Sequence, residues 1–223
     1  MKTNKKFLVF FGPPGSGKGT QADMLAEKIK LPVVCPGELL RHEIEIKSKI
    51  GKVVKLGVNS GKLVPDEITR KLIAARLKKK DAARGAIFDG YPRKREQQTF
   101  LIKKIKEISS NNYSFYAILI HVSNRGVKKR LGGRRACDCG LIYHLKYNPP
   151  KKRGICDECG DKLYVREDDK PGVITKRLRL FHKSTEPLLA YWRKAERLII
   201  INGEQSIKNV KRDIAKELKK RKF

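Results

Sequence analysis

The residues best placed to do chemistry lie near the start of the chain, directly after a short apolar run. The nonapeptide GPPGSGKGT occupies residues 12–20, and its glycines let the backbone curl so that successive N–H groups face one anion. Lys18 would reach the β- and γ-phosphates of a nucleotide, and a helix beginning near Gly19 would direct its positive end at them. The alternative is a glycine-rich turn that binds nothing. The residues of this predicted phosphate site are Gly15, Ser16, Gly17, Lys18, Gly19 and Thr20.

A carboxylate follows a second apolar run, AIFD at residues 86–89. Ligands of open α/β sheets bind outside the carboxyl ends of the strands, which is where Asp89 would lie. A carboxylate there can hold Mg²⁺ directly or through water. The alternative is that Asp89 caps the next helix. Gly19 stands at the position where this kind of loop usually has a hydroxyl ligand to Mg²⁺, and Thr20 follows it.

The cysteines form the third chemical group, since four of the five lie between residues 137 and 159. They form two pairs separated by sixteen residues, Cys137 with Cys139 and Cys156 with Cys159. Four thiolates around Zn²⁺ make a closed structural site with no open position for catalysis. His144 is an alternative fourth ligand, and reduced cysteines without a metal are the other alternative. Cys35 is isolated and is interpreted as a small buried residue.

The elements that must position these groups are predicted from apolar runs that alternate with helical periodicity. The runs are Phe7–Phe11, Leu31–Val34, Ala86–Phe88, Tyr116–Val122 and Leu198–Ile201. Runs of this length and composition are typical of strands buried on both faces. Two helical stripes lie between or after them, at Leu101, Ile105 and Ile108 and at Ile207, Val210, Ile214 and Leu218. The alternation predicts an α/β fold around a mostly parallel sheet.

Composition sets limits on the class of protein. A hydrophobic fraction of 39% excludes a disordered or collagen-like chain, and no apolar run reaches the length of a membrane span. The apolar stretch after the basic start is too short for a signal peptide, so we expect no membrane association and a cytoplasmic protein. The net charge of +30 and the basic tail at residues 211–223 indicate anionic partners, with non-specific nucleic-acid binding as a side property.

The phosphate loop resembles that of nucleoside monophosphate kinases, and further motifs extend the likeness along nearly the whole chain. PGELLR (36–41), GKLV (61–64) with Asp66, DGYPR (89–93), GRR (133–135) and NPP (148–150) resemble adenylate kinase motifs in the same order. The segment with the cysteines is similar to the zinc-bearing lid of one subgroup. The resemblance implies a three-layer P-loop fold with a five-stranded parallel sheet, an inserted AMP-binding segment and a zinc-ribbon-like lid. It also implies a monomer.

The resemblance also implies a division of the chain and a role for each motif residue. The core would comprise 1–34, 65–132 and 171–223, the AMP segment 35–64, and the lid 133–170. Catalytic residues would be Lys18, Asp89, Arg134, Arg166 and Arg177. ATP would contact the phosphate loop together with Arg130, Arg134, Ile142, Tyr143 and Gln205. AMP would contact Pro36, Arg41, Lys62, Leu63, Val64, Gly90, Tyr91, Pro92, Arg93, Gln97, Arg166 and Arg177.

The implied activity is reversible transfer of a phosphoryl group from ATP to AMP, giving two ADP, with Mg²⁺ and a structural Zn²⁺. Pro36 stands where the family usually has Thr, which keeps another nucleoside monophosphate open as the acceptor, while the long lid favours AMP. Asp168 and Asp169 would cap the next helix, orient arginines, or both. A zinc-ribbon nucleic-acid binder built on a nucleotide-switch domain is the alternative from a different class.

Overall fold

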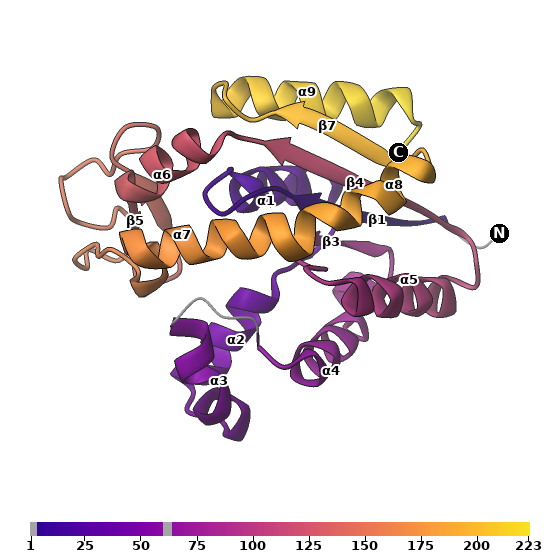
Figure 1. Cartoon of the computed structure of the whole chain (residues 1–223), viewed down its shortest axis with the longest axis horizontal. Coiled ribbons are helices and arrows are strands. Elements are labelled where there is room, and N and C mark those ends of the chain that lie inside the picture. The colour runs from indigo at the N-terminus through magenta and orange to yellow at the C-terminus, as the bar shows by residue number, and fades with distance from the viewer. Residues whose placement is uncertain (1–3, 60–63) are drawn as a thin grey trace.

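A five-stranded parallel sheet forms the centre of the computed structural model, which describes residues 4–59 and 64–223 (Figure 1). The strands are β1 (Lys5–Phe11), β2 (Val33–Val34), β3 (Gly85–Asp89), β4 (Tyr113–His121) and β7 (Leu198–Asn202), in the order β2-β3-β1-β4-β7. The predicted α/β fold and parallel sheet are confirmed. β2 is shorter than its apolar run, because Pro32 has no N–H and contributes only its carbonyl, which accepts from Ile87.

Helices cover both faces of the sheet and complete the three layers. One apolar cluster joins the sheet to α1 (Lys18–Ile29), α6 (Asn124–Gly133), α7 (Pro171–Leu180) and α9 (Ile207–Lys220). A second cluster joins it to α4 (Asp66–Leu77), α5 (Arg95–Ser109) and α8 (Leu189–Lys194). The two stripes read from periodicity lie on α5 and α9, where Leu101, Ile105, Val210, Ile214 and Leu218 are buried.

The second cluster contains Trp192, the sole tryptophan of the chain. Its ring packs edge-on against Phe115 at a centroid distance of 4.7 Å. The indole N–H donates to Gln98 Oε1 at 2.8 Å, which satisfies a polar group that is otherwise fully buried.

Two inserts extend from this core, and Figure 1 shows them at different places on its edge. The first contains α2 (Pro36–Glu45) and α3 (Lys49–Asn59), which share a small apolar cluster with Val64 and with Ile68 and Leu72 of α4. The second contains the antiparallel pair β5 (Arg134–Ala136) and β6 (Ile142–His144) with the loops that follow. The division of the chain into a core, an AMP segment and a lid that move as separate units stays a prediction.

Short helical turns connect the remaining elements. They are 3₁₀ turns at Lys80–Ala82, Glu167–Asp169 and Glu186–Leu188, and a π-helical turn at Phe181–Thr185. Among the described residues, no helix combines the length and the apolar character that crossing a lipid bilayer requires.

Candidate active site and cysteine cluster

The phosphate loop runs from the end of β1 to the start of α1, and its backbone needs glycine. Gly15 has a φ of +71°, and a Cβ atom there would lie 2.7 Å from Cγ of Leu131. Gly17 caps α1 with a φ of 93°, so the first N–H groups of the helix open toward the loop. Lys18 Nζ donates to the Pro13 carbonyl at 2.9 Å, which holds the ammonium over the loop. This arrangement can hold a phosphate group.

Lys18 is half-buried in a strongly charged environment. Burial lowers the pKa of Lys18 to about 8; Asp89 opposes this shift, whereas Arg93 and Arg177 reinforce it. A bound phosphate would add negative charge beside the ammonium and favour its protonated form. The site therefore suits a polyanion.

Asp89 ends β3 opposite the phosphate loop, where it does not cap a helix. The next helix, α5, has Lys94 at its N-cap position, so the helix-cap alternative is not what the structure shows. Asp89 Oδ1 is buried and accepts no hydrogen bond from the described residues. Its second oxygen, Oδ2, lies 3.2 Å from an ideal Cβ position on Gly19. A carboxylate with a free buried oxygen beside a phosphate site fits a magnesium ligand.

Asp168 and Asp169 gather three arginines from the lid and α7. Arg177 Nη1 lies 3.0 Å from Asp168 Oδ2 and 3.2 Å from Asp169 Oδ1. Arg166 pairs with Asp168 at 3.0 Å, and Arg134 makes two hydrogen bonds to Asp169. No side chain caps α7 at Lys170, so the acidic pair orients arginines rather than capping the helix.

Burial shapes the charge of this cluster. The Asp169 carboxylate is fully buried, which only its arginine partners make tolerable. Burial opposes ionisation of Asp168, but Arg177 and Arg166 outweigh it and hold the pKa of Asp168 below its usual value. Burial lowers the pKa of Arg177 to about 10, which leaves the guanidinium charged near neutral pH. The two carboxylates thus hold the three arginines in place, and the net charge of these five side chains stays positive.

One cleft joins the phosphate loop to the DGYPR motif and to α7. Its lining includes Gly12, Pro14, Lys18, Gly90, Pro92, Arg93, Arg177, Leu180, Phe181 and Thr185. Arg93 Nε donates to the Gly90 carbonyl at 2.7 Å, which turns the guanidinium along the cleft wall. Thr185 Oγ1 donates to the Arg93 carbonyl at 3.2 Å from the π-helical turn. Sequence reasoning missed Thr185, because no motif covers it and its partner is distant in the chain.

Several other residues predicted for the acceptor are not part of the cleft lining. Pro36 is buried at the first turn of α2, and Arg41 follows on the same helix, with Nη1 3.4 Å from an ideal Cβ on Gly37. Val64 and Tyr91 are buried. Lys62 and Leu63 lie outside the described residues.

Gln97 is the predicted base contact, and the structure gives its amide other partners. Gln97 Oε1 accepts from the Arg93 backbone N–H at 2.8 Å, and Nε2 donates to Asp66 Oδ1 at 2.8 Å. The side chain is buried, so both ends of the amide are satisfied inside the protein. A base would have to replace one of these partners.

Arg130 and Gln205, two of the residues predicted to contact the donor nucleotide, have hydrogen-bond partners within the protein. Arg130 donates to the carbonyls of Ser16 and Gly203, which ties α6 to the phosphate loop. Gln205 donates to the Asn202 carbonyl at 3.0 Å and to Asp213 Oδ2 at 2.7 Å. Both side chains therefore brace the rim of the site, and each is partnered within the protein.

Tyr143, a predicted contact of the donor nucleotide, has its side-chain partners inside the lid. Its ring is buried in the lid, and its hydroxyl accepts from the Asp157 N–H at 2.8 Å and lies 3.5 Å from Cys156 Sγ. Side chains alternate along a strand, so β6 directs Tyr143 toward the cysteines and leaves the neighbouring Ile142 43% exposed. The Tyr143 side chain therefore supports the lid core, and its contact with ATP stays a prediction.

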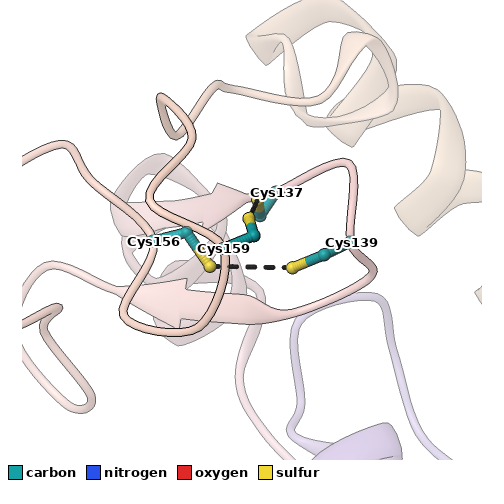
Figure 2. A group of neighbouring side chains, drawn as sticks. All are labelled: Cys137, Cys139, Cys156 and Cys159. Atoms are coloured by element: carbon teal, nitrogen blue, oxygen red, sulfur yellow. Dashed lines mark hydrogen bonds between the residues drawn. The ribbon is translucent and has the colours of Figure 1, made fainter.

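The four lid cysteines meet at one point, as Figure 2 shows. Their Sγ atoms all lie within 4.8 Å of one another, with Cys137–Cys159 at 3.3 Å and Cys139–Cys156 at 3.6 Å. Tetrahedral Zn²⁺ with bonds of about 2.3 Å requires sulfur atoms about 3.8 Å apart, so the cluster fits this metal. The short Cys137–Cys139 spacing does not prevent the thiols from converging.

His144 and Cys35 lie outside this cluster. His144 Nδ1 accepts from the N–H groups of Lys146 and Tyr147, at 3.0 and 3.2 Å, so its role as an alternative fourth ligand is not supported. Cys35 precedes α2 in the other insert.

Comparison with known proteins decides the family. The sequence profile described as "Adenylate kinase" matches residues 10–197. The chain belongs to the adenylate kinase family. It is 42% identical to adenylate kinase of Methanothrix thermoacetophila over 96% of this chain and 98% of that protein. It is 39% identical to adenylate kinase of Archaeoglobus fulgidus over 96% and 98% of the two chains, and 36% identical to that of Caldicellulosiruptor bescii over 95% and 98%.

Membership in the adenylate kinase family makes the protein a phosphotransferase of the nucleoside monophosphate kinase class. Adenylate kinases act on ATP and AMP or ADP and use Mg²⁺ with ATP. The alternative of a zinc-ribbon nucleic-acid binder, which the charge and the cysteines suggested, is therefore not the primary function.

Proposed function

We propose that the protein transfers the terminal phosphoryl group of ATP to AMP, giving two ADP, and runs the reaction in both directions. The observation that carries the proposal is a single cleft lined both by the phosphate loop and by Arg93 of the DGYPR motif. A protein that only bound or hydrolysed ATP would need one phosphate site. Two cationic sites facing one cleft suit transfer between two phosphates.

Positioning and neutralisation of charge do most of the work in phosphoryl transfer. The phosphate loop and Lys18 would hold the β- and γ-phosphates of ATP. Arg41 and Arg93 would hold the phosphate of AMP, which is already an anion and needs no base. Arg134, Arg166 and Arg177 would surround the transferred group, because planar guanidinium groups pair two phosphate oxygens at once.

Two metal ions complete the proposal. Asp89 would hold Mg²⁺, which would neutralise charge on the nucleotide phosphates. The four lid cysteines would hold Zn²⁺ in a closed site that stabilises the lid without taking part in chemistry. A closed lid would keep water from accepting the phosphoryl group. Ile142 and Tyr143 of the lid, Arg130 and Gln205 would border ATP, and Lys62, Leu63, Val64 and Gln97 would border AMP.

An acceptor panel tests the proposal. We expect phosphoryl transfer from Mg·ATP to AMP with a kcat/KM at least about 100-fold above those for CMP, UMP and GMP, because mismatched polar groups are costly to bury. A coupled ADP assay measures this, with Lys18→Ala as the control for contaminating kinase. Preference for another acceptor would assign a sister specificity, which Pro36 favours. Absence of transfer from folded, zinc-loaded protein would refute the kinase itself.

Thr185 provides a finer test of the acceptor site. Replacing Thr185 with Val keeps the shape but leaves the Arg93 carbonyl without its donor, so we expect KM for AMP to rise about 3- to 10-fold with kcat nearly unchanged. Thr185→Ser should restore KM. The matched control is Thr175→Val, which removes a similar hydrogen bond that an exposed hydroxyl of α7 donates to a backbone carbonyl. An equal rise in KM for ATP would argue against a specific role at the acceptor.

We also propose that the protein acts as a cytoplasmic monomer. Gel filtration with light scattering tests the oligomeric state, and a mass of twice the 25.5 kDa of the chain would contradict the proposal.

A further inference from the structure

The outer face of α9 carries a row of basic side chains. Its apolar side, with Val210, Ile214 and Leu218, is buried against the sheet. Its exposed basic residues, with those of the tail, are Lys208, Lys211, Arg212, Lys216, Lys219, Lys220 and Lys222. We call this set the α9 basic face. At about 100° per residue the basic side chains of α9 cover about half of the helix circumference, from Lys211 beside the buried stripe to Arg212 and Lys216 opposite it.

Few acids neutralise this face. The two carboxylates of α9, Asp213 and Glu217, are half-buried at its flank, where Asp213 accepts from Gln205 and pairs with Arg212, and Glu217 pairs with Lys220 and Arg221. Across residues 4–59 and 64–223, no ion pair includes the five remaining lysines of the face. Those lysines are Lys208, Lys211, Lys216, Lys219 and Lys222.

The positive surface continues onto α1, which packs against α9. Lys28 of α1 and Lys211 of α9 line the same shallow depression. Gln21 forms its floor, and its Oε1 atom is buried and accepts no hydrogen bond from the described residues. The fold thus holds like charges from two helices next to each other, an arrangement that an external polyanion would relieve.

The dimensions of the face fit a nucleic-acid backbone. Lys208 and Lys219 are eleven residues apart on one helix, about 17 Å along its axis. A duplex carries about one phosphate charge per 1.7 Å, so roughly ten charges lie along that length. Lysine ammonium groups contact phosphates as point charges and do not read bases.

We propose that the α9 basic face binds the phosphate backbone of duplex nucleic acid without reading its sequence. A membrane is a poorer partner, because an interfacial helix inserts its apolar side into lipid and that side of α9 lies in the core. Single strands are also poorer partners, since they need exposed aromatic rings for stacking. The one aromatic residue of this segment, Phe223, packs on Tyr116 at a centroid distance of 6.0 Å.

The face is separate from the catalytic cleft. None of the residues that line the cleft belongs to α9, and Figure 1 shows α9 along the sheet edge formed by β7, away from α2 and α3. Changes on this face should leave phosphoryl transfer intact. Nucleic-acid binding and kinase activity can therefore fail independently in an experiment.

The test is a salt titration of binding to a fluorescein-labelled 20-bp duplex of arbitrary sequence, followed by anisotropy from 25 to 300 mM KCl. The test variant is K208Q/K211Q/K216Q/K219Q. Its matched control is K78Q/K79Q/K80Q/K106Q, which removes the same charge from exposed lysines of α5 and of the segment between α4 and β3, on the opposite side of the sheet. Kinase activity of both variants verifies folding.

We expect the test variant to lose about 3 to 4 units of the slope of log K against log[KCl], at about 0.9 per lost phosphate contact, and at least tenfold in affinity at 50 mM KCl. The control should keep its slope within about one unit of the wild type. Equal losses in both variants would mean that binding is a diffuse property of the net charge. Tighter binding to phosphatidylserine vesicles than to the duplex, or no duplex binding at 50 mM KCl, would also overturn the proposal.

Discussion

Replacing Arg177 with Ala should lower kcat for ADP formation by about 10³-fold. Arginines that stabilise the charge of a transferring phosphoryl group contribute about 10³ to 10⁵ in rate. Arg177 lines the cleft, and two carboxylates fix its guanidinium. Arg177→Lys should recover only part of the rate, because the ammonium keeps the charge but loses the planar fork.

The control for this experiment is Arg179→Ala, on the same helix and exposed to solvent. It should reduce kcat less than twofold. Thermal melts of each variant are needed, since removing Arg177 also leaves the buried Asp169 with fewer partners. If Arg177→Ala kept kcat within about tenfold of Arg179→Ala, Arg177 would act as a structural counter-ion and not at the transition state.

Loss of the lid metal should have the second large effect. We expect purified protein to contain about one zinc ion per chain, and Cys156→Ser to lose it. The thermal midpoint of the protein should fall by about 10 °C, equivalent to roughly 3 to 5 kcal/mol for a chain of this size. kcat/KM should fall as well, because a loosened lid closes less completely over ATP.

Cys35→Ser is the matched control, since it removes a thiol outside the cluster. It should keep the full zinc content and the thermal midpoint of the wild type. Zinc analysis and calorimetry measure the two quantities. If chelation stopped catalysis while leaving the melting temperature unchanged, the metal would do more than stabilise the lid.

The sequence predicted the core of this fold well, because burial and short-range motifs determine it. The apolar runs at Phe7–Phe11 and Ala86–Phe88 became neighbouring strands, and Gly15 and Gly17 of the phosphate loop have the positive φ angles that favour glycine. The four cysteines were predicted to converge, and they do so despite the short first pair.

Hydrogen bonds between residues far apart in the sequence could not be predicted in the same way. The hydrogen bond from Thr185 to Arg93 spans 92 residues, and the bond from Gln97 to Asp66 spans 31. Neither leaves a periodic or motif signal in the sequence. The direction of the Tyr143 side chain was not predicted either, because it depends on the alternation along β6, which turns the ring toward Cys156.

The position of Trp192 determines what optical experiments on this protein can report. Its indole extends from α8 into the core, where it is hydrogen-bonded to Gln98 and packs on Phe115. No lid residue belongs to the apolar cluster that contains Trp192. Intrinsic tryptophan fluorescence should therefore follow the unfolding of the core and be nearly blind to the lid. If the lid melts first, a fluorescence curve will look two-state while calorimetry shows an earlier transition.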